Sequence, residues 1–197
     1  MNKKYELTEK TKEVMGVTMH QIRALTNSND VGGLIEKEEN LSQSGNAWVG
    51  GDAKVSGNAW VSDNAKVSGN ATVSGNAWVC DNAKVGGDAK VCGNARVGGD
   101  ATVSGNARVS GDALIWSKHH LWITPRMGSR NDVTTFFRNV NNQISVVCGC
   151  FYGTIDEFAE QVKKTHGDNK HAHDYNRAIQ MAKIWIDLSE VENETEN

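Results

Sequence analysis

Residues 45–116 read, without interruption, GNAWVG GDAKVS GNAWVS DNAKVS GNATVS GNAWVC DNAKVG GDAKVC GNARVG GDATVS GNARVS GDALIW. Each of these twelve hexapeptides has a branched aliphatic residue at its fifth position, from Val49 to Ile115, and an alanine at its third. Gly-Asn, Gly-Asp or Asp-Asn opens each unit, and these residue types tolerate a positive φ and favour turns. A fixed period of six is typical of a parallel β-helix. Each unit therefore predicts a short strand followed by a corner.

The period also predicts how the strands stack. Three units make one turn of a triangular prism, so twelve units predict about four turns. Strands of adjacent turns pair about 4.8 Å apart. The aliphatic residue and the alanine of each unit are expected to point inward, and the residue just before the aliphatic is expected to point outward. The fold class predicted from this stretch is mainly β, with a parallel β-helix over residues 45–116.

The N-terminal segment, residues 1–44, is expected to cap one end of the prism, because a solenoid end exposes unpaired backbone groups. Runs with strand character occur around Tyr5–Leu7 and Val17–Leu25. Ile35 and Leu41 lie six residues apart, like the aliphatic residues of the repeat. This segment therefore predicts a β-rich cap and an irregular first turn.

The repeat stops after Trp116, and residues 117–197 predict a small α+β domain. Thr154 and Glu157 have the spacing of a capping box at the start of a helix. The predicted elements are strands over 121–124, 133–140 and 143–149, a helix after Thr154, and a second helix over 171–188. The chain is thus expected to contain three parts, 1–44, 45–116 and 117–197.

The outward residues of the repeat form three columns, one on each side of the prism. Along successive turns they are Trp48, Lys66, Lys84 and Thr102; Lys54, Thr72, Lys90 and Arg108; and Trp60, Trp78, Arg96 and Leu114. Trp60 and Trp78 are expected to stack one turn apart. A flat apolar stripe is typical of a contact surface, and a ladder of side chains without a partner is the alternative. We predict protein-contact residues at Trp48, Trp60, Trp78, Arg96 and Leu114, and a basic face at Lys54, Lys90 and Arg108.

Two segments carry resemblances to known proteins. TKEVMGVTMHQIRAL (11–25) and GGLIEKEENLSQSGNAWV (32–49), followed by the repeat, resemble bacterial and prophage hexapeptide-repeat proteins, which are often labelled acetyltransferases or polymer-forming proteins. This resemblance implies that the parallel β-helix is left-handed, and it favours a symmetric oligomer, a trimer or a dimer. GSRND (128–132) and CGCFYGTIDEFAEQVKKTHGDNKHAHDY (148–175) resemble a terminal module of phage and prophage proteins of low-GC Gram-positive bacteria.

An acyltransferase of this resemblance would need a catalytic histidine and cationic groups for the phosphates of acyl-CoA. Residues 45–116 contain no histidine, and their basic residues are spread thinly over two sides. His119 and His120 follow the last unit directly and are interpreted as surface histidines. We therefore expect no catalytic residue, no cofactor and no enzymatic activity, with acyl transfer as the alternative.

The C-terminal segment invites a metal-site hypothesis at His166, His171 and His173 together with Cys148 and Cys150. Zinc ligands must converge on one point, whereas residues two apart on a helix point in nearly opposite directions. Structural histidines and buried thiols are the preferred interpretation, and metal binding stays open as an alternative. All four cysteines, including Cys80 and Cys92, are predicted to be free thiols.

Composition gives few further limits. The formal net charge of −3 provides no general drive towards nucleic acid or anionic membranes, and no apolar run reaches the length of a membrane span. A cytoplasmic protein is expected, in the host cytoplasm if it is phage-encoded. The preferred function is a non-enzymatic phage-type binding protein that engages and inhibits a host protein or ribonucleoprotein complex, for example as an anti-CRISPR protein. A structural self-assembling module is the other alternative.

Overall fold

The computed structural model describes residues 3–25 and 30–189. The chain divides into two compact units, a solenoid unit over residues 1–118 and a C-terminal unit over residues 119–197. No helix in the described part of the chain combines the length and the apolar character needed to cross a membrane. Each unit has its own sheets and its own buried core.

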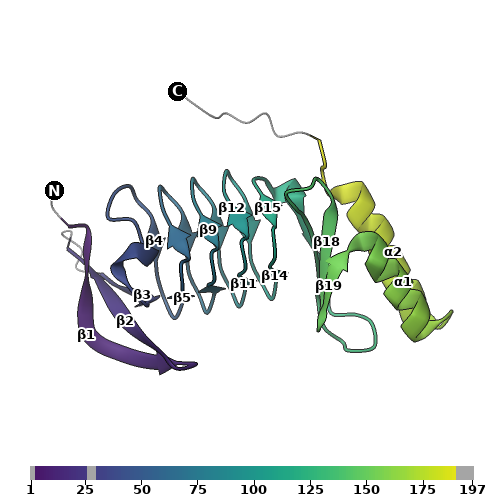
Figure 1. The fold of residues 1–197 in the computed structure, drawn as a ribbon, viewed down its shortest axis with the longest axis horizontal. Helices are drawn as coiled ribbons and strands as arrows, with labels where there is room; N and C mark the ends of the chain where they lie inside the picture. Colours follow the sequence, from purple (N-terminus) through teal and green to yellow (C-terminus); the bar gives the residue numbers. More distant parts are fainter. Residues whose placement is uncertain (1–2, 26–29, 190–197) are drawn as a thin grey trace. The chain divides into compact units, whose positions relative to one another are not determined.

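The solenoid unit confirms the hexapeptide prediction: each of the twelve units forms one two-residue strand (Figure 1). Strands of the same side pair in parallel, with a register of eighteen residues, as between Trp60 and Trp78. The strands are β4 (Trp48–Val49), β7 (Lys66–Val67), β10 (Lys84–Val85) and β13 (Thr102–Val103) on one side, β5 (Lys54–Val55), β8 (Thr72–Val73), β11 (Lys90–Val91) and β14 (Arg108–Val109) on the second, and β6 (Trp60–Val61), β9 (Trp78–Val79), β12 (Arg96–Val97) and β15 (Leu114–Ile115) on the third.

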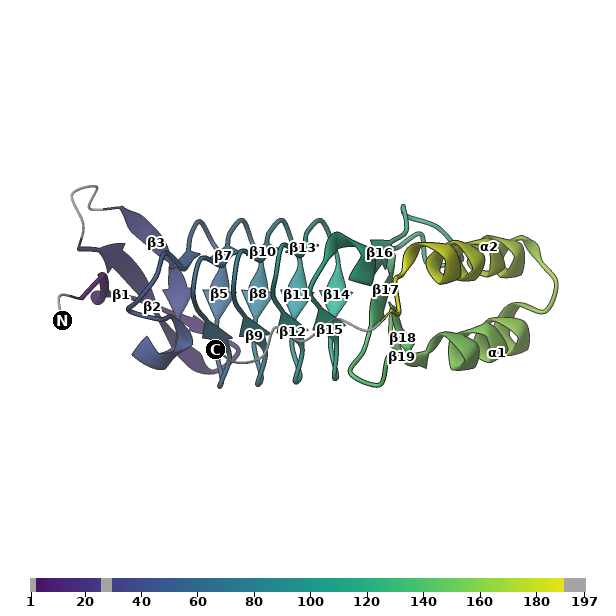
Figure 2. The same ribbon diagram turned by 90° about the horizontal axis from the view of Figure 1, so that it is seen from above.

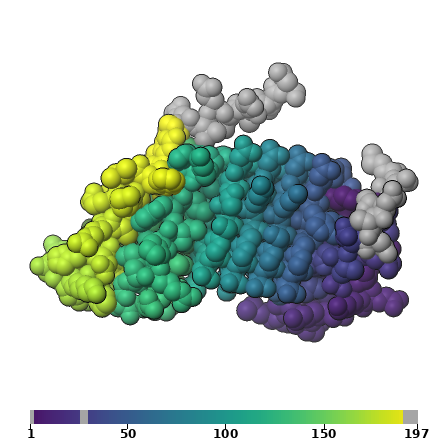
Figure 3. Space-filling view, turned by 180° about the vertical axis from the view of Figure 1, so that it is seen from behind, coloured from purple at the N-terminus to yellow at the C-terminus, as the bar shows by residue number. Residues whose placement is uncertain are grey.

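The interior of the solenoid is filled by the predicted residue types. Every valine of the repeat, together with Ile115, is at most 1% exposed, and so is every alanine from Ala47 to Ala113. The small alanine lets the chain turn close to the axis, while the valine fills the space between turns. Successive turns are in continuous atomic contact (Figure 3). The core therefore repeats one pair of side chains along its whole length.

The second residue of each unit forms a ladder that the repeat pattern alone did not reveal. Seven asparagine amides of the repeat donate to the side-chain oxygen eighteen residues later, at 2.9–3.3 Å between heavy atoms. Two complete ladders are Asn46–Asn64–Asn82–Asp100 and Asn58–Asn76–Asn94–Asp112. An aspartate carboxylate only accepts hydrogen bonds, so it suits the last position of each ladder. In the third column, only Asn70 donates in this way, to Asp88 at 2.9 Å.

An irregular turn precedes the regular array, as predicted from Ile35 and Leu41. Ile35 pairs with Val55 and Leu41 with Val61, each in parallel. The offset is twenty residues rather than eighteen, because eight residues rather than six separate Leu41 from Val49. A one-turn 3₁₀ helix, η1 (Glu38–Asn40), lies between the two pairing positions.

A β-hairpin extends one side of the solenoid beyond this turn (Figure 2). β1 (Tyr5–Val14) pairs antiparallel with β2 (Val17–Ala24), and β2 pairs antiparallel with β3 (Val31–Ile35). Tyr5 is completely buried, and its hydroxyl donates to the carbonyl oxygens of Glu38 and Leu41 at 2.9 and 2.8 Å. Burial raises the pKa of Tyr5, so the hydroxyl stays a donor to these carbonyls.

The C-terminal unit contains a four-stranded antiparallel sheet followed by two helices that lie side by side (Figure 2). The sheet order is β16 (Leu121–Ile123), β17 (Thr134–Arg138), β18 (Ile144–Cys148) and β19 (Phe151–Thr154). The helices are α1 (Ile155–His166) and α2 (Lys170–Trp185), and a 3₁₀ turn, η2 (Lys118–His120), comes before β16. Three of the four strands were predicted, whereas β19 was not.

The capping box at the start of α1 is confirmed. The Thr154 hydroxyl accepts from the Glu157 amide at 3.3 Å, and the Glu157 carboxylate accepts from the Thr154 amide at 2.7 Å. The helices pack on the sheet through aromatic residues, with ring centroids 6.0 Å apart for Phe136 and Phe158 and 5.5 Å apart for Phe158 and Tyr175. This core is irregular and contains large side chains, unlike the core of the solenoid.

Candidate contact face on the solenoid

The column with two tryptophans forms as predicted. Trp60 and Trp78 are register partners, and their rings stack with centroids 5.6 Å apart and planes 12° apart. Arg96 and Leu114 follow on the next two turns of the same sheet. Trp60 is 43% exposed, which is high for an indole, while Trp78 is half-buried. We call Trp60, Trp78, Arg96 and Leu114 the tryptophan column.

The backbone beneath the tryptophan column is fixed on both sides. The amide of Trp60 donates to the Ala77 carbonyl at 2.9 Å, and the amide of Trp78 donates to the Ala95 carbonyl at 2.8 Å. The valines that follow the two tryptophans are fully buried in the interior. The backbone that carries the two indoles is therefore rigid. Binding of a partner to the indoles would cost the solenoid little backbone entropy.

Trp48 lies elsewhere, although it was predicted to be a contact residue. Its strand belongs to another side of the solenoid, the side that carries Lys66 and Lys84. The ring packs over Gly32, where an added Cβ would lie 2.8 Å from the Trp48 ring. Trp48 thus covers the irregular first turn, and the structure does not bring it together with the tryptophan column.

The predicted basic residues share the second side of the solenoid. Lys54, Lys90 and Arg108 all lie in the sheet that also contains Thr72, and Lys90 is the register partner of Arg108. The ammonium group of Lys54 donates to the Asp52 carbonyl at 3.0 Å. These cations form a row that is separate from the tryptophan column.

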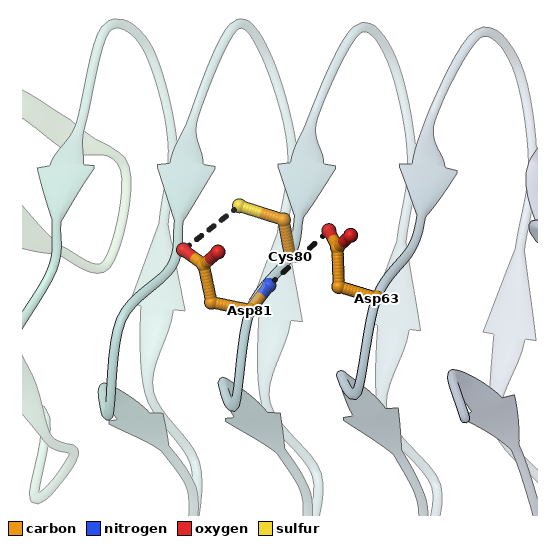
Figure 4. Close-up of side chains that lie close together, drawn as sticks. All are labelled: Asp63, Cys80 and Asp81. Atoms are coloured by element: carbon orange, nitrogen blue, oxygen red, sulfur yellow. Dashed lines mark hydrogen bonds between the residues drawn. The ribbon is translucent and has the colours of Figure 1, made fainter. Parts of the chain in front are cut away.

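A cluster beside the tryptophan column was missed in the sequence. Asp63, Cys80 and Asp81 lie at one corner of the prism, on two successive turns (Figure 4). Their carboxylate and sulfur atoms all lie within 4.8 Å of one another. A chain of hydrogen bonds links this acidic corner to the column: the Trp78 Nε1 donates to the Ser62 hydroxyl at 3.4 Å, and that hydroxyl donates to Asp63 Oδ2 at 2.6 Å.

Hydrogen bonds to the backbone hold the acidic corner in place. Asp63 Oδ2 accepts from the Asp81 amide at 3.4 Å (Figure 4). Asp81 Oδ2 accepts from the Gly99 amide at 2.8 Å. The Cys80 thiol donates to the same Asp81 oxygen at 3.4 Å. Burial, followed by the charges of Asp81 and Asp63, raises the pKa of Cys80 to about 12. Cys80 is therefore a neutral thiol at physiological pH and a poor nucleophile.

The backbone of the acidic corner gives a signal that the sequence does contain. All twelve units begin with a residue of positive φ, and ten of these residues are glycine. Asp63 and Asp81, at φ values of 58° and 54°, are the two that are not. A left-handed conformation disfavours a side chain, although aspartate tolerates it better than most residues. These two Asp-Asn units mark the corner in the sequence.

The donor set of the acidic corner is one that a divalent metal such as zinc accepts, since carboxylates and a thiolate are among its ligands. In this structure, however, the thiol proton, both carboxylates and two backbone amides are already joined by hydrogen bonds. The hydrogen bonds alone account for the arrangement. We therefore regard the acidic corner as a charged border of the tryptophan column.

The histidines and cysteines of the C-terminal unit do not converge as one set. Gly149 has a φ of 61° and ends β18 after Cys148, so Cys148 and Cys150 do not lie on one strand. Cys148 is half-buried 3.9 Å from the Tyr175 hydroxyl, and Cys150 is exposed, which corrects the expectation of two buried thiols. The rings of His166 and His171 lie 5.7 Å apart. His173 is exposed and pairs with Asp168 at 3.4 Å.

The prediction that His119 and His120 both lie at the surface is wrong for one of them. His119 is exposed, as expected, but His120 is only 4% exposed. Its Nε2 lies 3.3 Å from a guanidinium nitrogen of Arg138, which is itself buried. Burial and the Arg138 charge lower the pKa of His120, so its ring is neutral at physiological pH. Its position indicates a structural role.

Comparison with known proteins bears on the solenoid. Residues 65–81 and 95–111 match the model of the YdcK beta solenoid repeat family. The matched segments include Trp78, Cys80, Asp81 and Arg96, and so cover part of the tryptophan column and of the acidic corner. No match to the chain was found among curated proteins. The likeness to this repeat family agrees with the fold and identifies no ligand.

Proposed function

We propose that this protein is a non-enzymatic binding protein, and that the tryptophan column is its contact face for another protein. The observation that carries this proposal is the stacked pair of Trp60 and Trp78 on a rigid wall, with Trp60 43% exposed. Tryptophan and arginine are enriched at the energetic centres of interfaces, and Arg96 is the next member of the column. Large exposed apolar patches on soluble proteins are often functional.

The surroundings of the tryptophan column indicate what a partner surface offers. The acidic corner places the exposed Asp63 and Asp81 along one border of the column. Interfaces commonly combine an apolar centre with charges at the rim, and complementary charges steer association. The surface that fits is therefore an apolar or aromatic patch next to lysine or arginine residues.

The phage resemblances of the N-terminal and C-terminal segments support a narrower form of this proposal. In that form the protein is encoded by a phage or prophage, engages a host protein or ribonucleoprotein complex, and inhibits it. An inhibitor of a defence system, including an anti-CRISPR protein, is one such function. A second copy of the chain is the competing occupant, because hexapeptide-repeat solenoids resembling this one commonly form symmetric oligomers.

The proposal also implies that the solenoid does not transfer acyl groups. The repeat contains no histidine, and the thiol at the acidic corner is protonated at physiological pH. The repeat residues described above therefore include neither a histidine base nor an activated thiol at the acidic corner. An acetyl-CoA turnover assay on the full chain tests this point, and turnover that depends on His119 would contradict it.

The contact face is tested with the double variant Trp60→Ser/Trp78→Ser. The matched control is Lys66→Ser/Lys84→Ser, which truncates the equivalent outward positions of two adjacent turns on another side. Both variants leave the interior intact, so circular dichroism and thermal unfolding should match the wild type. Sedimentation velocity and affinity capture from host lysate, quantified by mass spectrometry, measure assembly and partner recovery.

The expected result is loss of one assembly state, or loss of a captured partner, in the tryptophan variant alone. A change of sedimentation coefficient without loss of a foreign partner identifies a second copy of the chain as the occupant. If the tryptophan variant keeps the wild-type assembly state and partner set, the column is only a ladder of stacked side chains and the proposal fails.

A further inference from the structure

We propose that the C-terminal unit carries a separate binding site for a small phosphorylated ligand of nucleotide size. The site is a cleft of about 550 Å³ between α2 and the segment that joins β16 to β17. We call it the α2 cleft. Its walls come entirely from the C-terminal unit, and ligand sites of small molecules commonly have volumes of about 300–1,000 Å³.

Positive charge is concentrated at the α2 cleft. Arg126, Lys170 and Arg177 line it, together with a single carboxylate, Asp174. The whole segment 119–197 has eight lysine and arginine residues against eleven aspartate and glutamate residues. Three of its eight cations thus face one cleft in a unit that is negative overall. Such a local excess favours an anionic ligand.

The side chains of the three cations make no polar contact with the described residues of the unit. All three side chains are exposed, and none makes a hydrogen bond or an ion pair with any residue that the structure describes. Asp174 is one helical turn from Lys170 and three residues from Arg177, spacings at which ion pairs commonly form. No such pair is present among the described residues. The guanidinium and ammonium groups therefore remain available to phosphate oxygens, which they bind well.

The floor of the α2 cleft is apolar. Met127, Ala178 and Met181 contribute to its lining. Trp122 adds one ring, which is held in place because it packs on Phe136 at a centroid distance of 5.5 Å. A cationic rim over an apolar floor suits a ligand that joins phosphate groups to an apolar or aromatic body.

The cleft is formed before any ligand arrives, because its loop is anchored to α2. An added Cβ at Gly128 would lie 2.1 Å from the Tyr175 hydroxyl, and Gly128 has a φ of 69°. The loop also closes on itself, with the Met127 amide donating to the Asp132 carbonyl at 3.1 Å. Only glycine allows this close approach, so the loop that carries Arg126 is held against the helix.

One polar atom at the cleft lacks a partner within the unit. His171 Nδ1 is buried and makes no hydrogen bond to any described residue. The backbone amides of His171 and Ala172 are already satisfied, because both donate to the Asn169 side chain. Buried polar atoms without a partner are rare in native proteins. His171 lines the cleft, but its Nδ1 is closed to solvent, so this nitrogen is not among the ligand contacts of the proposed site.

The test measures binding of ATP and of inorganic pyrophosphate to the full chain by isothermal titration calorimetry. The variant is Arg126→Gln/Arg177→Gln, which removes two cations of the α2 cleft. The matched control is Lys163→Gln/Lys164→Gln, which removes two exposed cations of α1 that do not line the cleft. All four positions are exposed, so each protein should fold, which circular dichroism verifies.

We expect the wild type to bind ATP or pyrophosphate, the arginine variant to bind about tenfold more weakly or less, and the lysine control to stay within about twofold. Three results overturn the proposal: no heat of binding for either probe at about 1 mM, equal weakening by both variants, or a single-stranded oligonucleotide that binds more tightly than ATP. The tryptophan variant of the solenoid should bind ATP like the wild type, so this test is independent of the proposed contact face.

Discussion

The solenoid unit and the C-terminal unit build their cores in opposite ways. The solenoid repeats one valine and one alanine at every strand, so its interior is narrow and uniform. The C-terminal unit instead packs a few large aromatic residues, including Phe136, Phe158 and Tyr175, between a sheet and two helices. Because its interior is filled by small side chains along its length, we expect the solenoid to bind through its outer faces. An irregular core leaves clefts between elements that pack at different angles.

The largest expected effect comes from truncating the aromatic core. Phe136 is completely buried and contacts the rings of Trp122 and Phe158. Phe136→Ala removes the ring and leaves a cavity, which should lower the free energy of unfolding of the C-terminal unit by about 3–5 kcal/mol. Urea unfolding followed by near-ultraviolet circular dichroism measures this loss. The solenoid signal in the far ultraviolet should remain, and simultaneous loss of both signals would mean that the two units unfold together.

The solenoid should be destabilised most by a substitution that adds side-chain volume to its interior. Ala83 is completely buried in a middle turn, where the narrow interior has no room for a longer side chain. Ala83→Leu should destabilise the solenoid by about 1–3 kcal/mol, and thermal unfolding measures it. Lys84→Ser, at the adjacent exposed position, should be nearly neutral. Equal destabilisation by the two variants would contradict the inward and outward register.

The same contrast explains how much the sequence could predict. In the solenoid, a period of six places every side chain, so the strands, the inward residues and the stack of Trp60 on Trp78 all follow from the pattern. The acidic corner was missed because Asp63 is 17 and 18 residues from Cys80 and Asp81, and these positions of the unit were not compared between turns. The two Asp-Asn units would have revealed it, since they place aspartate where ten other units have glycine.

The C-terminal unit could be predicted only element by element. Strands and helices follow local patterns, but β19 was missed because Gly149 separates it from β18 by a tight turn and only four residues form it. The α2 cleft depends on how the loop near Gly128 packs against Tyr175, nearly fifty residues away. A local sequence pattern gives no information about a contact between residues so far apart in the chain. Sites of this unit therefore require the tertiary structure.

The smallest expected effect concerns the thiols of the two units. Cys80 in the solenoid is 4% exposed, whereas Cys150 in the C-terminal unit is exposed. With a pKa of about 12, Cys80 carries about one thiolate per ten thousand molecules at pH 8. Iodoacetamide should therefore label Cys150 and spare Cys80 in the native protein, as measured by peptide mass spectrometry. Comparable labelling of both residues would mean that the acidic corner opens in solution.

The causes of the raised pKa can then be separated with Asp81→Asn. Burial is the largest cause and remains in this variant, while the charge of Asp81 is removed, so labelling of Cys80 should rise only slightly.

The raised pKa of Cys80 also predicts how the stability of the solenoid depends on pH. Because the pKa of Cys80 is raised in the folded state, its contribution to stability is complete below the ordinary pKa of 9.0 and is lost as the pH rises towards about 12. Unfolding measured between pH 8 and pH 11 should show a shallower loss of stability in Cys80→Ser than in the wild type. An identical pH dependence of the two proteins would show that this thiol is not held in its neutral form by the solenoid.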